Sequence, residues 1–295
     1  MLQKTLATVV AIVLGSTVVS CAKVEELDKA EIPFTISSMG PIRTAEHVTV
    51  PVRGVEREFY VYASPEASNG DLPVIFAFHG RGSSAQSFAN ATGLHESQAI
   101  VIYPEGIEQS WAPAYYRQDH QGDDLAFMDA LSTWAQETYG VEQDQMMATG
   151  HSNGGGFVRY VSCQRPGMFS AITTMSGAMY EEVVEDCHDP GTDYLNIHAA
   201  HDPVVEYEGD TRRSGGKTYS YLAVPDVLEQ AAELNECDVA PAIDAEATVQ
   251  REVYACETAR LEHVKVASNS HSWLHKTPVD STTETLEFFD IDYSG

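Results

Sequence analysis

The chain has 295 residues, of which 43% are hydrophobic and 21% charged, and its formal net charge at pH 7 is −27. That length is sufficient to bury the core of one large α/β domain or of two small ones. Because so acidic a surface would repel a phosphate backbone, the charge argues against nucleic acid as a partner.

The beginning of the chain has the features of an export signal. Lys4 supplies a short positive region, and residues 6–19 form an apolar run of signal-peptide length, which is short for a membrane span. Residues 18–21 resemble a bacterial lipobox, in which the cysteine is acylated and becomes the mature N-terminus. The predicted parts are a lipoprotein signal peptide over residues 1–20, an acylated Cys21 with a tether over residues 21–44, and one folded domain over residues 45–295.

These features predict an exported protein that is lipid-anchored to the bacterial cell envelope. The lipoprotein sorting rule points to the outer membrane, because Ala22 is not an aspartate. The alternative is an ordinary secretory signal, in which case Cys21 is unmodified and the protein is secreted.

Four cysteines remain beside Cys21, and an even number in an oxidising compartment predicts two disulfides. Three connectivities are possible. We favour Cys163–Cys187 with Cys237–Cys256 because each bond closes a loop of modest length, and four free buried thiols are the alternative.

Strands and helices are expected to alternate along the folded domain. β-branched and aromatic residues predict two antiparallel strands that flank a turn at Gly54. The predicted strands cover residues 48–52, 59–62, 73–78, 99–103, 146–149, 171–176, 195–199 and 262–267, and the predicted helices follow Asp124 and Gly154 and cover residues 225–236 and 282–289. This alternation indicates an α/β fold, with a mostly parallel central sheet, antiparallel N-terminal strands and helices on both faces. We interpret Asp123 and Asp124 as caps of the helix that ends at Gly140.

Residues 150–154, Gly-His-Ser-Asn-Gly, form a G-x-S-x-G pattern directly after an apolar strand. In this setting the serine lies on a sharp strand-to-helix turn, so that its hydroxyl projects from the edge of the sheet. Gly150 and Gly154 allow the strand and the helix to cross closely. Ser152 is therefore the candidate nucleophile.

A serine hydroxyl needs a base within hydrogen-bond reach, and the base needs an orienting acid. Asp202 and His271 each follow a predicted strand, and the chain order Ser, Asp, His is that of the α/β-hydrolases. We predict that these two residues complete a triad with Ser152. The alternatives are that Asp202 is only a turn residue before Pro203, and that the base is instead His201, His263 or His275.

An acyl-transfer site also needs two preorganised donors for the oxyanion. The candidates are the backbone N–H groups of Asn153 and Arg81, and the alternative for the His79-Gly80-Arg81 segment is a simple tight turn.

Aromatic side chains in loops could bind substrate. Trp111, Trp273 and Tyr115 could stack on an aromatic acyl group or a sugar ring, and the alternative is that they pack beneath their loops. His198 and His201 are three residues apart, which on a strand places them on opposite faces. We therefore predict no metal and no cofactor.

The ordered motifs resemble those of the polyhydroxybutyrate-depolymerase-type esterases, an α/β-hydrolase group that includes feruloyl and acetylxylan esterases. The resemblance covers roughly residues 48–289. It rests on Phe78-His79-Gly80-Arg81-Gly82, Tyr103-Pro104-Glu105-Gly106 with Trp111, residues 123–127, residues 148–155, residues 201–207, Asn235-Glu236-Cys237 and His271-Ser272-Trp273. The chain departs from the family beside the candidate base, at residues 268–270 and 274–275.

The resemblance implies the triad Ser152, Asp202 and His271, the same oxyanion pair and two local disulfides. It further implies a secreted or surface-anchored serine esterase that hydrolyses feruloyl, acetyl-polysaccharide or short polyester bonds through an acyl-enzyme. The alternatives are a serine peptidase of the same fold and a non-catalytic lipoprotein that binds carbohydrate.

Overall fold

The computed structural model describes residues 45–293, apart from residues 64–66, 68–69, 118–120, 190, 215, 239 and 276–277. The predicted signal peptide, the acylated Cys21 and the tether lie outside the described residues and stay predictions. Among the described helices, none combines the length and the apolar character that crossing a membrane requires.

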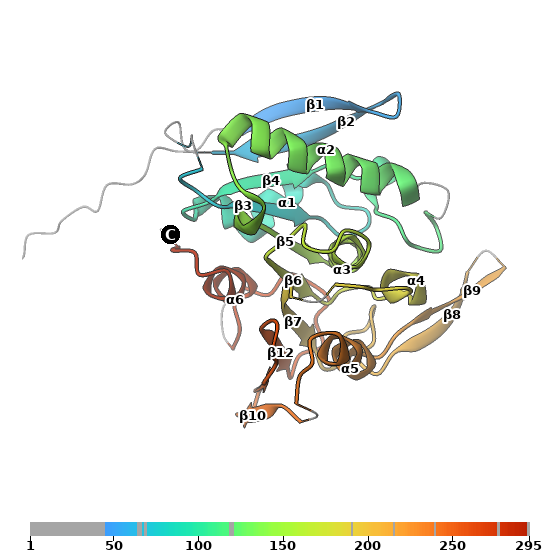
Figure 1. The fold of residues 1–295 in the computed structure, drawn as a ribbon. Coiled ribbons are helices and arrows are strands. Elements are labelled where there is room, and N and C mark those ends of the chain that lie inside the picture. The colour runs from blue at the N-terminus through green and yellow to red at the C-terminus, as the bar shows by residue number, and fades with distance from the viewer. Residues whose placement is uncertain are drawn as a thin grey trace, which may run out of the picture. The chain divides into compact units, whose positions relative to one another are not determined.

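Within the described residues, ten strands form one sheet in the order β1-β2-β4-β3-β5-β6-β7-β12-β11-β10 (Figure 1). The strands are β1 (Glu46–Val52), β2 (Val55–Tyr62), β3 (Val74–Phe78), β4 (Ile100–Pro104), β5 (Met146–His151), β6 (Ala171–Met175), β7 (Asp193–Ala199), β10 (Ala242–Ala245), β11 (Val249–Tyr254) and β12 (Leu261–Val266). Neighbouring strands from β4 to β12 in this order are parallel. The strands at both edges pair antiparallel. The predicted fold class is confirmed, and the second antiparallel edge, β10 and β11, is an addition that was not predicted.

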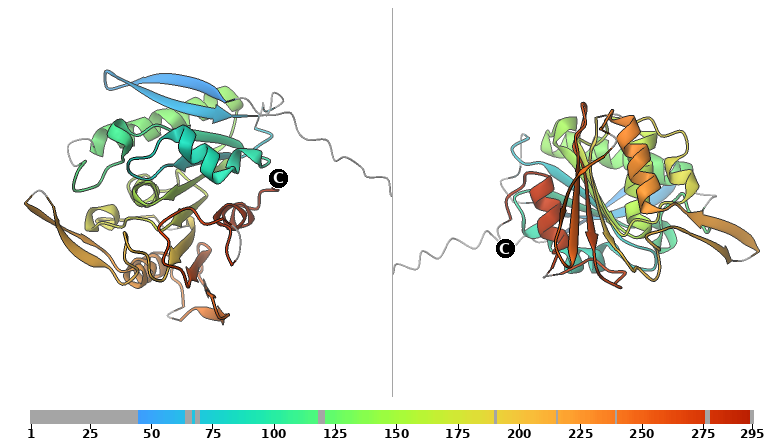
Figure 2. Two further views of the ribbon diagram at one scale, coloured as in Figure 1. Left: turned by 180° about the vertical axis from the view of Figure 1, so that it is seen from behind. Right: turned by 90° about the horizontal axis from the view of Figure 1, so that it is seen from below.

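Helices cover both faces of this sheet, as the view from below in Figure 2 shows. Helices α2, α3, α4 and α5 pack on one face, and α1 and α6 pack on the other. The helices are α1 (Ala85–Thr92), α2 (Gln121–Tyr139), α3 (Asn153–Gln164), α4 (Glu181–Val184), α5 (Val224–Leu234) and α6 (Ser281–Phe288), with short 3-10 turns η1 (Leu94–Glu96), η2 (Ile107–Gln109) and η4 (Gln143–Gln145).

Strand β3 shows why a continuous apolar run predicts a central strand. All five of its residues are buried. Val74, Phe76 and Phe78 pack in the core under α2 and α3, whereas Ile75 and Ala77 pack in the core under α1 and α6. Because side chains alternate between the faces of a strand, both faces must be apolar when both are covered.

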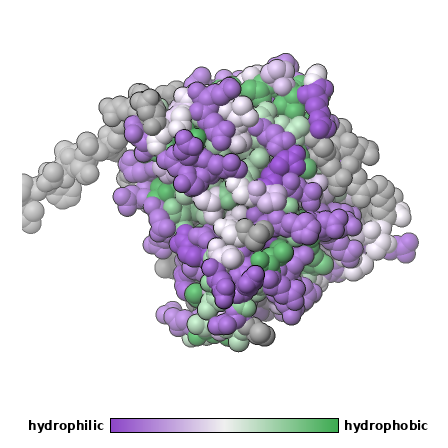
Figure 3. Space-filling model, viewed as in Figure 1, coloured by the Kyte–Doolittle hydropathy of each residue, from purple (hydrophilic) through white to green (hydrophobic). Residues whose placement is uncertain are grey.

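A second, two-stranded sheet consists of β8 (Asp210–Ser214) and β9 (Lys217–Tyr221), which extend away from the main sheet in Figures 1 and 2. It was not predicted. On the face shown in Figure 3, hydrophilic residues predominate and hydrophobic residues are scattered among them. This distribution agrees with the strongly negative formal charge of the chain.

The structure pairs Cys163 with Cys187 and Cys237 with Cys256, as predicted. The interpretation of Asp124 as a helix cap is wrong. Its carboxylate is completely buried and forms ion pairs with two arginines, which lie 2.9 and 3.3 Å away.

Candidate active site

Ser152 lies between β5 and α3 in a backbone conformation that is strained for a residue with a side chain. Its φ is 56° and its ψ is −122°, and such conformations persist only where the surroundings fix them. The Ser152 N–H donates to Met175 O at 3.0 Å, and its carbonyl accepts from the N–H of Ala178 at 2.8 Å. A Cβ on Gly150 or on Gly154 would collide with neighbouring backbone. These contacts hold the serine at the turn.

The structure brings Asp202 and His271 to this serine from two other strands. The His271 Nε2 atom lies 2.9 Å from Ser152 Oγ, and His271 Nδ1 lies 2.8 Å from Asp202 Oδ2. An Nδ1–H that donates to the carboxylate leaves Nε2 free to accept the serine proton. The three predicted residues therefore form one continuous chain of hydrogen bonds.

Asp202 is held as a carboxylate at the end of β7. Burial alone would raise its pKa, but hydrogen bonds from His271 and from the N–H groups of Val205 and Val204 outweigh burial and lower the pKa to about 2. The N–H groups of Val204 and Val205 donate to Asp202 Oδ1, at 2.8 and 2.9 Å respectively. The aspartate is thus charged and fixed beside His271 across the whole neutral range.

The other histidines proposed as the base lie elsewhere. His263 is buried on β12, where Nδ1 donates to Asn196 O and Nε2 accepts from the Tyr207 hydroxyl. His201 and His275 are exposed. His271 is the one of the four that contacts both Ser152 and Asp202.

The turn after β3 lies directly against the nucleophile. A Cβ on Gly80 would be 3.2 Å from both Ser152 Cβ and His151 Nδ1, so glycine permits this approach. Arg81 follows Gly80, and Asn153 is the first residue of α3, where N–H groups have no partner within the helix. The roles of the Arg81 and Asn153 N–H groups as oxyanion donors stay predictions.

Two of the three residues that we predicted to contact substrate are buried, as in the alternative that they pack beneath their loops. Trp111 is completely buried and donates its indole N–H to His79 O at 3.0 Å. Trp273 is 5% exposed and donates its indole N–H to Thr282 Oγ1 at 2.9 Å. Both indole groups are used inside the protein, because a buried N–H must find an acceptor.

Tyr115 differs from the two tryptophans because it is only partly buried. Its ring stacks on that of Tyr219 in β9, with ring centroids 3.7 Å apart, and its hydroxyl accepts from Arg81 Nη1 at 3.4 Å. It therefore lies beside the turn after β3, which packs against Ser152. A contact between Tyr115 and substrate stays a prediction.

Sequence reasoning missed two histidines beside the triad. The ring of His151 lies 4.9 Å from that of His271, and burial lowers the pKa of His151 to about 3. Burial likewise lowers the pKa of His79 to about 4. Both are therefore neutral at pH 7. The sequence signal was their position directly beside Ser152 and Gly80. Within the described ranges, no group of three His, Cys, Asp or Glu side chains is arranged to hold a metal ion.

The chain has the α/β-hydrolase fold, and its triad contacts lie at the carboxyl ends of parallel strands, where ligands bind in open α/β sheets. It belongs to the Esterase family, whose model matches residues 52–212. The expected resemblance to feruloyl and acetylxylan esterases is confirmed at the level of family and fold.

Among relatives, feruloyl esterase C of Emericella nidulans is 29% identical over 176 residues, which are 55% of this chain and 61% of the relative. Feruloyl esterase D of Neurospora crassa is 26% identical over 167 residues, which are 50% and 55% of the two chains. The chain thus spans less than two thirds of the length of these relatives. The structure of acetyl xylan esterase from Aspergillus awamori has a TM-score of 0.60 at 16% identity and covers 84% of this chain and 99% of its own.

Proposed function

We propose that the protein is a serine esterase that hydrolyses carboxylic esters through an acyl-enzyme. The observation that carries the proposal is the unbroken contact from Ser152 Oγ to His271 Nε2, at 2.9 Å, and from His271 Nδ1 to Asp202 Oδ2, at 2.8 Å. This arrangement makes a weak nucleophile reactive at neutral pH, because the proton that the serine loses has a positioned acceptor.

In the first half-reaction, Ser152 Oγ attacks the ester carbonyl while His271 Nε2 takes the hydroxyl proton. The charged Asp202 stabilises the imidazolium that forms. The N–H groups of Arg81 and Asn153 bind the developing oxyanion. His271 then protonates the leaving alcohol, and the acyl group stays on Ser152. Water, deprotonated by the same imidazole, releases the acid in the second half-reaction.

The substrates that we propose are feruloyl or acetyl esters of polysaccharides, with short polyester oligomers as a further group. The names of the relatives and of the structural neighbour support the first two. A panel of methyl ferulate, acetylated xylan and hydroxybutyrate oligomers, ranked by kcat/KM, tests this order.

The hydrolysis of 4-nitrophenyl acetate by the wild type and by Ser152→Ala tests the chemistry. We expect the substitution to lower kcat by at least about a thousandfold, because it removes the nucleophile. A sulfonyl fluoride should also react with Ser152 of the wild-type protein with loss of HF, which adds the reagent's mass less that of HF, and should leave the variant unmodified. Equal rates for the two proteins, with matching circular dichroism spectra, would remove Ser152 from the mechanism.

We also propose that the protein is exported and anchored through Cys21. The two disulfides support export, because such bonds persist in oxidising compartments. Mass spectrometry of the mature N-terminus tests the anchor. We expect a lipid-modified cysteine as the first residue, and an unmodified Cys21 would contradict the anchor.

A further inference from the structure

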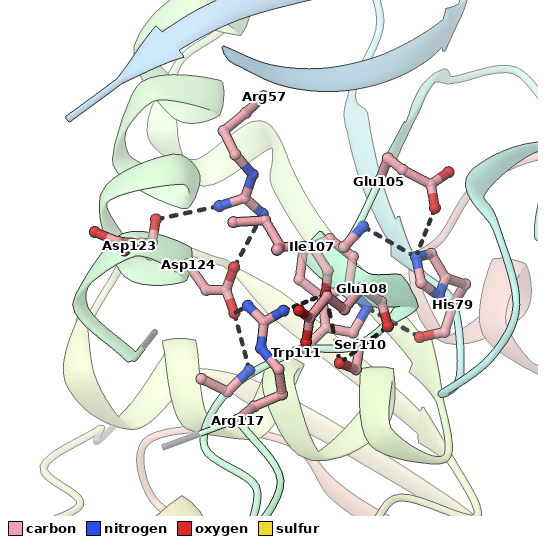
Figure 4. Close-up of polar contacts among 12 residues, drawn as sticks. Arg57, His79, Glu105, Ile107, Glu108, Ser110, Trp111, Arg117, Asp123 and Asp124 are labelled. Carbon is pink, nitrogen blue, oxygen red and sulfur yellow. Dashed lines mark hydrogen bonds and ion pairs between the residues drawn. The ribbon is translucent and has the colours of Figure 1, made fainter. Parts of the chain in front are cut away.

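Residues 106–111, here called the brace, are hydrogen-bonded to the turn that precedes Arg81 (Figure 4). The N–H of Gly106 donates to His79 Nε2 at 3.1 Å, and the indole N–H of Trp111 donates to His79 O at 3.0 Å. The two ends of the brace thus hold both the ring and the backbone of His79. Gly106, Trp111 and His79 are all buried.

The same segment is clasped by the side chain of Asn153. The Trp111 N–H donates to Asn153 Oδ1 at 2.7 Å, and Asn153 Nδ2 donates to the Trp111 carbonyl at 2.9 Å. Two opposed hydrogen bonds between one amide and one residue leave neither group free to rotate, and Asn153 is only 3% exposed. The backbone N–H of Asn153 is one of the two candidate oxyanion donors.

His79 controls the other candidate donor through a shared peptide plane. The carbonyl of Gly80 and the N–H of Arg81 belong to one planar unit, so fixing the carbonyl also fixes the direction of the N–H. His79 Nδ1 donates to Gly80 O at 2.9 Å, and the N–H of Ser83 donates to the same oxygen at 3.1 Å. Because Gly106 donates to His79 Nε2, the histidine proton must be on Nδ1.

Two buried charged side chains, Asp124 and Arg117, form hydrogen bonds with the brace and with the residue that follows it (Figure 4). Asp124 Oδ2 accepts from the Ala112 N–H at 2.9 Å, and Arg117 donates to Ile107 O. Arg117 also pairs with Asp124 at 3.3 Å. Asp124 and Arg117 thus hold the brace near both of its ends, through contacts that do not involve Arg81 or Asn153.

We propose that the brace sets the spacing and direction of the two oxyanion N–H groups, and that His79 and the side chain of Asn153 are the positioning residues through which it acts. The inference rests on the proposed function. Donors must lie about 2.7–3.1 Å from the oxyanion to stabilise it. The turn follows β3 and α3 follows β5, and these two strands pair in the sheet as far as Phe78 and Gly150. Beyond the ends of these strands, the brace adds hydrogen bonds to both the turn and α3.

Two substitutions of His79 separate its two hydrogen bonds. The amide nitrogen of asparagine can take the place of Nδ1, so His79→Asn keeps a donor for Gly80 O. The terminal amide of glutamine reaches the place of Nε2, so His79→Gln keeps a partner for Gly106 and loses the donor to Gly80. We expect His79→Gln to lower kcat about tenfold to a hundredfold, which is less than the loss of a whole oxyanion donor, and to leave KM nearly unchanged. His79→Asn loses the hydrogen bond from Gly106 of the brace but keeps the donor to Gly80, so its kcat should lie between those of His79→Gln and the wild type.

Asn153→Asp tests the clasp in the same way. The aspartate has nearly the shape of asparagine and keeps the backbone N–H, but it cannot donate to the Trp111 carbonyl. We expect a loss of kcat similar to that of His79→Gln. For both variants, the affinity for phenylboronic acid, which forms a reversible tetrahedral adduct with a serine, should fall in proportion to kcat/KM.

The control is Thr92→Val, which removes a buried hydrogen bond of 3.0 Å to the Tyr103 hydroxyl on the other face of the sheet. It should lower the melting temperature, because a buried hydrogen bond is lost, without a change in kcat or in boronate affinity. If His79→Gln and Asn153→Asp keep wild-type kcat and boronate affinity while Ser152→Ala is inactive, the brace proposal is overturned and the proposed function stands. If Ser152→Ala is as active as the wild type, the proposed function fails and the brace proposal fails with it.

Discussion

Three buried charges meet at Asp124, in the first turn of α2. The side chains of Arg57, Arg117 and Asp124 are 2%, 1% and 0% exposed, and each arginine pairs with the aspartate. Burial raises the pKa of Asp124 although both arginines lower it, and burial lowers the pKa of Arg57. The guanidinium of Arg57 also lies 4.0 Å from the centroid of the Phe127 ring. A charge this deep is tolerated only while its partners remain.

We expect Asp124→Asn to lower the free energy of unfolding by about 3–5 kcal/mol, because it leaves two buried guanidinium groups without a carboxylate. The matched control is Asp123→Asn, one residue earlier. The Asp123 side chain is 34% exposed and pairs with Arg53 at 3.7 Å, so its loss should cost about 1 kcal/mol or less. Urea unfolding measures the free energy of unfolding of both variants. Equal losses would show that the carboxylate of Asp124 stabilises the fold no more than that of Asp123.

At the scale of elements, the two disulfides differ in how far they lie from solvent. Cys163, in α3, and Cys187, after α4, are 3% and 6% exposed. Cys237, after α5, and Cys256, after β11, are only partly buried. The buried bond ties α3 to the segment after α4, and the more accessible bond ties the segment after α5 to the segment after β11.

We expect dithiothreitol to cleave Cys237–Cys256 before Cys163–Cys187 in the native protein, since a thiolate must reach the sulfur that it attacks. Loss of either bond should lower the free energy of unfolding by about 3 kcal/mol, because the loops that they close have similar lengths. Alkylation followed by peptide mass mapping at successive times gives the order. Simultaneous or reversed cleavage would contradict it.

A strong burial signal marks several of the elements that sequence patterns predicted. Strands β3, β4 and β6 are buried at every position. The pattern missed β10, which is exposed at every position, so its residues carry no apolar alternation. It also missed the eight-residue helix α1, whose sequence Ala-Gln-Ser-Phe-Ala-Asn-Ala-Thr contains one large apolar residue. A pattern based on hydrophobicity therefore detects buried elements more readily than exposed ones, and β1, which is mostly exposed, was predicted from its β-branched residues instead.

In the candidate site, too, some features could be predicted from the sequence and others could not. Ser152, Asp202 and His271 were predictable because each follows a strand, in an order that a parallel sheet brings to one edge. The pair of hydrogen bonds between Asn153 and Trp111 was not predictable, because it joins the side chain of one residue to the backbone of another 42 positions away. Nor can sequence tell whether a loop tryptophan points outward. Trp111 and Trp273 point inward because acceptors for their indole groups lie there.

At the scale of the whole molecule, buried histidines oppose folding in acid. Burial lowers the pKa of His79 to about 4 and those of His151 and His263 to about 3, and it also lowers the pKa of His198. An unfolded chain titrates its histidines near about 6.5. Between that pH and the lower folded values, the unfolded state binds more protons, so stability falls as pH falls. Glu105 and Glu262 act in the opposite direction, because burial raises their pKa values.

We expect the free energy of unfolding to fall by several kcal/mol between pH 7 and pH 5, since each neutral buried histidine contributes a slope of up to about 1.4 kcal/mol per pH unit. His263→Gln isolates one such group, because His263 lies on β12 and bonds to Asn196 O and Tyr207 rather than to the triad. The variant should be less stable at pH 7. Its free energy of unfolding should also change less steeply with pH, by the amount that corresponds to about one proton taken up on unfolding. Urea unfolding at half-unit steps of pH measures both slopes. Parallel curves for the two proteins would mean that His263 takes up no proton on unfolding, and would assign the acid sensitivity to other groups.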